Sequence, residues 1–151
     1  MKRIVLLIVV AGVAFAGWRT ASRWRAKTAY EAFAEAWTHG NMADAKKYGT
    51  EECAKHALEE RSLRGLESGQ AMEAFRGTRY RYEKETVSDG GDLELEVHQT
   101  IFFDPPGITS AIGGAMYTGI QHSATLRNTP EGWRVIAFEP RYIDMGPLRR
   151  R

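Results

Sequence analysis

Two histidines and two glutamates in the second half of the chain have the types and spacing that a reactive site would need. Glu94, Glu96 and His98 alternate along the chain, so in a strand their side chains would share one face. His122 lies in a later strand-like segment, and pairing of the two strands would make the histidines cross-strand neighbours. Such a cluster fits a metal site of two histidines and one carboxylate, or an acid–base pair near neutral pH. The plainer interpretation, which we favour, is two surface or half-buried histidines.

Other polar residues give weaker indications of a site. Tyr117 would join His98 and His122 if a pocket opened between the sheet and the helices, because a tyrosine hydroxyl can donate a proton there. Asp104 precedes two prolines and is more typical of a turn at a strand end than of a catalytic carboxylate. Cys53 has acidic neighbours, which disfavour a thiolate. We therefore assign no catalytic residue, no metal ligand and no cofactor.

The charges divide the chain into three segments. Among 151 residues, 21 are Lys or Arg and 19 are Asp or Glu, for a net charge of +2. Residues 1–27 hold six basic residues and no acidic one, residues 28–148 hold 12 basic and 19 acidic residues, and residues 149–151 are all arginine. The central segment is therefore net acidic, which argues against a nucleic-acid-binding surface.

The N-terminus has the composition of a membrane segment. After Lys2 and Arg3, residues 4–18 are uncharged and would form roughly 22 Å of helix, short of the ~30 Å hydrocarbon core. A cleaved signal peptide over residues 1–16 is one interpretation. We favour an uncleaved anchor with a basic collar over residues 1–27, because basic residues cluster directly after the apolar run. The predicted anchor residues are Ile4, Leu7, Val10, Phe15, Trp18, Arg19, Arg23, Trp24 and Arg25, and the small residues predicted to pack against another helix are Gly12 and Ala16.

Periodicity after the basic collar predicts helices first. Apolar residues from Tyr30 to Trp37 follow the i, i+3, i+4, i+7 repeat, and Gly40 is expected to end that helix. Asn41 is expected to cap a helix over residues 42–48. A third helix is expected from about residue 51 to residue 64, with Thr50 before it as the cap.

The later segments alternate with period two and predict strands. These are residues 79–88, 93–103, 117–128 and 133–142, joined by turns or by a longer link after residue 103. The order predicts an α+β domain over residues 28–145, with helices packed on a curved antiparallel sheet of about four strands. Residues 146–151 are expected to form a basic tail. The long link carries a candidate docking loop of Pro105, Pro106, Ile108 and Ile112, or equally an extra turn of helix that closes the open end of the domain.

Two short stretches resemble a known family. Residues 36–41 read Ala-Trp-Thr-His-Gly-Asn before an alanine-bearing helix, and residues 132–136 read Gly-Trp-Arg-Val-Ile at the start of the last strand. Both resemble nuclear-transport-factor-2-like domains, and the resemblance extends over residues 28–143. It implies a cone of sheet and helices, in a superfamily that holds both isomerase-like or dehydratase-like enzymes and non-catalytic scaffolds. A single span before one such domain resembles the inner-membrane assembly component of type IV secretion systems.

Together these features favour a non-catalytic, membrane-anchored binding or assembly subunit of a larger membrane or envelope complex. The predicted location is a bacterial inner membrane. Basic residues on both sides of the apolar run slightly favour a cytoplasmic domain, whereas the resemblance of the N-terminus to export signals favours a periplasmic domain, which we adopt. Its expected partners are membrane lipids and other membrane-complex subunits rather than nucleic acid, and a homo-oligomer is compatible with this interpretation. The alternative is a small-molecule-binding or isomerase-like or dehydratase-like enzyme that uses the cone pocket.

Overall fold

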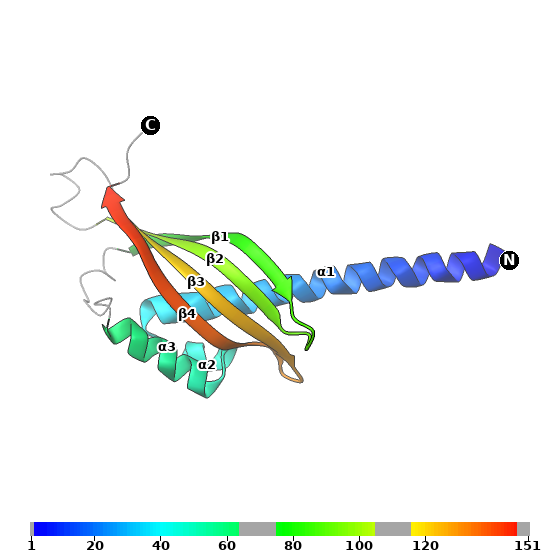
Figure 1. The fold of residues 1–151 in the computed structure, drawn as a ribbon, viewed down its shortest axis with the longest axis horizontal. Helices are drawn as coiled ribbons and strands as arrows, with labels where there is room; N and C mark the ends of the chain where they lie inside the picture. The colour runs from blue at the N-terminus through cyan, green and yellow to red at the C-terminus, as the bar shows by residue number, and fades with distance from the viewer. Residues whose placement is uncertain (1, 64–74, 105–115, 148–151) are drawn as a thin grey trace.

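The computed structural model describes residues 2–63, 75–104 and 116–147, with the backbone alone for residues 2–16, 19, 62–63 and 144–147. Three helices, α1 (Lys2–His39), α2 (Met42–Tyr48) and α3 (Glu51–Leu63), precede four strands. The strands are β1 (Phe75–Val87), β2 (Leu93–Phe103), β3 (Met116–Thr129) and β4 (Gly132–Pro147), and they form one antiparallel sheet in the order β1-β2-β3-β4. The helices pack on the sheet, which confirms the predicted α+β class (Figure 1).

α1 is one continuous helix of 38 residues. Its C-terminal half crosses the sheet, and its N-terminal half projects past the end of the sheet that carries the β1–β2 and β3–β4 turns (Figure 1). The helix has no break at residue 27, where the sequence suggested the edge of the domain. Ser22 Oγ of α1 accepts a hydrogen bond from Trp133 Nε1 of β4 at 3.3 Å, and among the residues whose side chains the structure describes the first buried residue of α1 is Ala26. In the part of the chain that the structure describes, no helix is long and apolar enough to cross a membrane.

The helix ends follow from local side-chain chemistry. Gly40 has φ of +68°, and the amide of Asn41 donates to Ala36 O at 2.8 Å, as in a Schellman ending of α1. Asn41 Oδ1 then accepts from the Asp44 amide at 3.2 Å and begins α2. Thr50 Oγ1 accepts from the Cys53 amide at 3.3 Å and begins α3. The predicted caps and the predicted bounds of α2 are confirmed.

Alternation along β2 determines which side chains enter the core. The odd-numbered residues Leu93 to Ile101 are all buried, while their even-numbered neighbours are exposed or half-buried. The register continues this face across the sheet, with Leu93 opposite Leu126 and Leu95 opposite Ala124. The large buried side chains that meet this face are Tyr30, Phe33 and Trp37 from α1, with Ile120, Val135 and Phe138 from β3 and β4.

Two strand bounds differ by more than one residue from the sequence expectation. β1 begins at Phe75, four residues earlier than predicted, because Phe75 pairs with Phe103 at the end of β2. β4 continues through Gly146 and Pro147, which were expected to belong to the tail, because they pair with Tyr117 and Met116 of β3. Neighbouring-strand hydrogen bonds extend these strands where side-chain alternation gives no signal.

Candidate functional site

The interior holds a buried polar pair that joins α1 to β3. Tyr30 OH and His122 Nδ1 lie 2.6 Å apart, and both residues have 0% of their surface exposed. When Tyr30 donates, Nδ1 accepts and the imidazole proton resides on Nε2, which has no hydrogen-bond partner among the described residues. This tautomer satisfies the tyrosine hydroxyl and one ring nitrogen with a single hydrogen bond.

The surroundings keep both members of the pair uncharged. Burial, with a smaller contribution from the charge of His98, lowers the pKa of His122 to about 3. Burial also raises the pKa of the Tyr30 hydroxyl well above its ordinary value, with neighbouring tyrosines acting in the same direction. A neutral imidazole with so low a pKa is a poor general base near pH 7, since such a base needs a pKa near the working pH.

Aromatic rings occupy the space around His122. The Trp37 ring centre lies 5.4 Å from that of His122 at 84°, and the Phe138 ring centre lies 4.7 Å from it at 63°. Phe33 packs edge-on against Phe138 at 5.2 Å. These are the edge-to-face arrangements that aromatic side chains prefer. The rings leave His122 inaccessible to a substrate in this conformation.

A second buried network lies on the same face of the sheet. Gln99 Nε2 donates to Thr38 Oγ1 at 3.0 Å and to Thr78 Oγ1 at 3.1 Å, which links β2 to α1 and β1. Tyr80 OH lies 3.4 Å from the same nitrogen. Gln99 Oε1 is buried and has no hydrogen-bond partner among the described residues. The network positions helix and strands relative to one another, because each contact joins different elements.

The three predicted pocket residues do not line one pocket. His122 lies opposite Val97 and therefore points into the core, whereas His98 lies opposite Gln121 on the other face of the sheet. Tyr117 lies opposite Phe102, which alternation also places on that outer face. The interpretation of two surface or half-buried histidines holds for His98 and is wrong for His122. The two histidines alternate out of phase, so the sheet separates their side chains.

Sequence reasoning missed the partner of His122. Tyr30 was assigned to the apolar stripe of the helix, which is correct, but its hydroxyl reaches a residue 92 positions away. The available signal was the parity of β3: His122 shares its spacing with the apolar residues Ile120 and Ala124. That parity alone indicates that His122 faces inward.

The described residues contain no group of three or more His, Cys, Asp or Glu side chains placed to hold a metal ion. Cys53 is buried on α3, and burial raises the pKa of its thiol to about 11. A thiol with that pKa stays protonated near neutral pH and is a weak nucleophile. This agrees with the expectation that Cys53 does not form a thiolate, but the cause is burial rather than the acidic neighbours.

The basic collar divides between the sheet and the surface. Lys27 Nζ lies 2.7 Å from a Glu85 carboxylate oxygen on β1, and Arg23 Nε lies 3.5 Å from the other oxygen. The Lys27 ammonium also lies 4.6 Å from the ring centre of Tyr82. Trp18 and Trp24, by contrast, have 63% and 70% of their surface exposed. Thus part of the collar holds α1 to β1, and its two indoles face outward.

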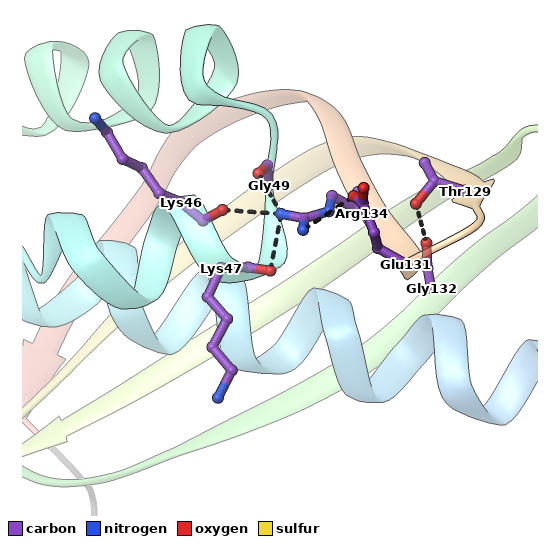
Figure 2. Close-up of polar contacts among 7 residues, drawn as sticks. All are labelled: Lys46, Lys47, Gly49, Thr129, Glu131, Gly132 and Arg134. Atoms are coloured by element: carbon purple, nitrogen blue, oxygen red, sulfur yellow. Dashed lines mark hydrogen bonds and ion pairs between the residues drawn. The ribbon is translucent and has the colours of Figure 1, made fainter.

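Arg134 connects β4 to the end of α2 (Figure 2). Its Nη1 donates to the carbonyl oxygens of Lys46 at 3.0 Å and Lys47 at 3.1 Å, with Gly49 O at 3.4 Å. Nη2 donates to Glu131 at 3.3 Å in the β3–β4 turn. A cation at the C-terminus of a helix satisfies its last carbonyls and opposes its dipole. Arg134 therefore stabilises the junction of helix and hairpin.

Several predicted residues lie where the structure gives no side-chain description. Ile4, Leu7, Val10, Phe15, Gly12 and Ala16 lie in the backbone-only part of α1, as does Arg19, and the loop residues Pro105, Pro106, Ile108 and Ile112 lie outside the described residues. No protein-family model, no curated protein and no solved structure matches the chain.

Proposed function

We propose that this protein is a non-catalytic, membrane-anchored binding or assembly subunit of a larger membrane or envelope complex. The observation that carries the proposal is the continuity of α1. One helix contains the uncharged run of residues 4–18, projects beyond the sheet, and then supplies Tyr30, Phe33 and Trp37 to the core (Figure 1). Such a helix would transmit the orientation of a membrane segment directly to the folded domain.

The filled interior supports a binding or assembly role over catalysis. Tyr30, Trp37, His122 and Phe138 are at most 2% exposed, and the only titratable pair among them is neutral. An isomerase-like enzyme with this arrangement of elements would need an open pocket with at least two convergent groups that exchange protons. The order of helices and strands agrees with a nuclear-transport-factor-2-like cone, which we propose as the closest analogy for the fold.

The proposed location is a bacterial inner membrane, with the domain in the periplasm. A helix over residues 4–18 is shorter than the hydrocarbon core is thick. Local thinning of the bilayer, or extension of the flanking basic side chains to the lipid headgroups, would accommodate it. Trp18 and Trp24 would lie near the headgroups, where exposed indoles are stabilised. The partners would be lipids and other subunits of the complex.

The test begins with the full-length chain produced in a Gram-negative bacterium. We expect it to remain in the membrane fraction after a carbonate wash and to become protease-sensitive when the outer membrane is opened. A matched variant that lacks residues 4–18 should lose both behaviours while retaining the folded domain. Extraction of the full-length chain by carbonate would refute the anchor.

The assembly role needs a separate measurement. The chain should be solubilised in a mild detergent through a C-terminal affinity tag, and its mass determined by light scattering. We expect defined co-purifying membrane proteins that disappear when residues 4–18 are replaced by an unrelated membrane span of equal length. Recovery of a monomer without partners would count strongly against an assembly subunit.

A further inference from the structure

Trp133 lines two surface hollows at the end of the sheet from which α1 projects. One hollow, of about 230 Å³, is lined by the apolar side chains of Trp18, Val87 and Leu93, and also by Ser22, Asn128 and Arg23, which is paired with Glu85; we term it the apolar hollow. The other, of about 360 Å³, is lined by Trp24, Arg25 and Lys47 among others, and we term it the cationic hollow. Both are lined by residues of α1 and of the β3–β4 hairpin.

The cationic hollow carries two exposed positive charges. Arg25 on α1 and Lys47 at the end of α2 are exposed, and no ion pair joins either one to a described acidic side chain. The other two charged residues of the lining, Arg134 and Glu131, form a hydrogen bond with each other, and Arg134 also donates to carbonyl oxygens of α2 (Figure 2). Trp24 and Trp133 add aromatic surface beside these charges. The lining therefore fits a ligand in which an anionic group is attached to an apolar group.

The two hollows follow one another along α1. Trp18 lines the apolar hollow and Trp24 lines the cationic hollow, and six residues of helix separate them by about 9 Å. The apolar hollow is the nearer of the two to the uncharged run of residues 4–18. In a bilayer leaflet the acyl chains form the hydrocarbon core, and the glycerol region lies nearer to that core than the phosphate does. The one cation of the nearer hollow, Arg23, is paired with Glu85, whereas Arg25 and Lys47 of the farther hollow have no acidic partner among the described residues. The position of these two cations thus matches that of the phosphate in a phospholipid.

We propose that these hollows bind one anionic phospholipid, with its glycerol region against Trp18 and Val87 and its phosphate between Arg25 and Lys47. This inference rests on the proposed membrane attachment. Phosphate would receive charge-assisted hydrogen bonds from two cations supplied by different helices. The indole of Trp133 would separate the phosphate from the apolar part. Bound lipid would thereby fix the face that the domain turns toward the membrane.

The test measures lipid retention by the full-length protein in mild detergent with native mass spectrometry. Phosphatidylglycerol and phosphatidylcholine are added in equal amounts, and we expect preferential retention of one phosphatidylglycerol. The variant Arg25→Gln/Lys47→Gln should weaken that retention by at least about tenfold, because each charge-assisted contact is lost. The control Lys55→Gln/Lys84→Gln removes two exposed cations elsewhere and should retain lipid like the wild type.

Equal retention of the two lipids by the wild type would overturn the proposal, as would unchanged retention in Arg25→Gln/Lys47→Gln. Flotation with phosphatidylcholine vesicles separates this outcome from failure of the membrane attachment. A wild type that floats but shows no lipid preference refutes the lipid site alone. A wild type that fails to float refutes the attachment and the lipid site together. Thermal unfolding monitored by circular dichroism confirms that each variant is folded.

Discussion

Acid should destabilise this protein through one buried residue, His122. In the folded state the imidazole is fully buried among aromatic rings and accepts a hydrogen bond from Tyr30, so its neutral form is strongly favoured. In the unfolded chain it is hydrated and binds a proton more readily. Below the ordinary histidine pKa the unfolded state therefore holds more protons than the folded state, and stability falls as the pH falls.

The magnitude follows from the two pKa values. The folded-state pKa is about 3 and the ordinary value is 6.5, so the loss begins below pH 6.5 and continues toward pH 3. Each pH unit in this window costs about 1.4 kcal/mol. Between pH 7.5 and pH 4.5 the free energy of unfolding should therefore fall by about 3 kcal/mol through His122. A domain of this size has roughly 5–15 kcal/mol in total, so the effect is readily measurable.

The assay is urea unfolding of the full-length protein in mild detergent, followed by tryptophan fluorescence at several pH values from 7.5 to 4.5. The informative variant is Tyr30→Phe/His122→Leu, which removes both polar partners and keeps the volume similar. Replacement of both members of a hydrogen-bonded pair by apolar groups is often nearly neutral near pH 7. In this variant the acid-induced loss should be about 3 kcal/mol smaller than in the wild type.

His56→Gln supplies the matched control, because His56 is exposed on α3. This variant should show the same dependence on pH as the wild type. If Tyr30→Phe/His122→Leu loses stability with acid as steeply as the wild type, His122 is not the buried neutral group described here. If His56→Gln and Tyr30→Phe/His122→Leu both lose stability with falling pH as steeply as the wild type, the acid sensitivity comes from carboxylates instead.

Three further predictions concern the joints between elements. Gly49→Ala should cost about 1–3 kcal/mol of unfolding free energy in urea titrations, because the Cβ of the alanine would overlap the Phe33 ring. Gly90→Ala is the control, because the nearest atom to a Cβ placed there is 3.8 Å away. Equal urea midpoints for the two variants would contradict the packing argument. Arg134→Lys should cost about 1 kcal/mol and speed amide exchange in α2, since lysine lacks the guanidinium fork; unchanged exchange would argue against the contact. Asn41→Ala should cost about 1 kcal/mol by the same titration through loss of the cap, and no change would mean that another group caps α2.

Contacts within a few residues could be predicted from the sequence. The bounds of α2 were recoverable because Asn41 caps the helix through the amide three residues later. The inward face of β2 was recoverable because one alternating pattern extends from Leu93 to Phe103. Both signals depend only on backbone geometry and on side chains close in the chain.

Contacts across the sheet could not be predicted in the same way. The environment of His122 depends on the register that places it opposite Val97, and on a helix that brings Tyr30 within 2.6 Å of its ring. Arg134 was equally ambiguous, because nothing near it in the chain indicates that its guanidinium reaches the carbonyls of Lys46 and Lys47. Register and helix placement are long-range properties, so residue types alone leave them undetermined.

The sequence by itself determined the class of the domain, its order of helices and strands, and the net acidic character that follows a basic N-terminal segment. Those properties depend on composition, periodicity and local caps. Only the tertiary structure decided that α1 is one helix from the projecting segment into the core, and that His98 and His122 lie on opposite faces of the sheet. It also placed Trp133 beside Trp18 and Trp24, because packing brings the last hairpin against a helix more than 100 residues earlier.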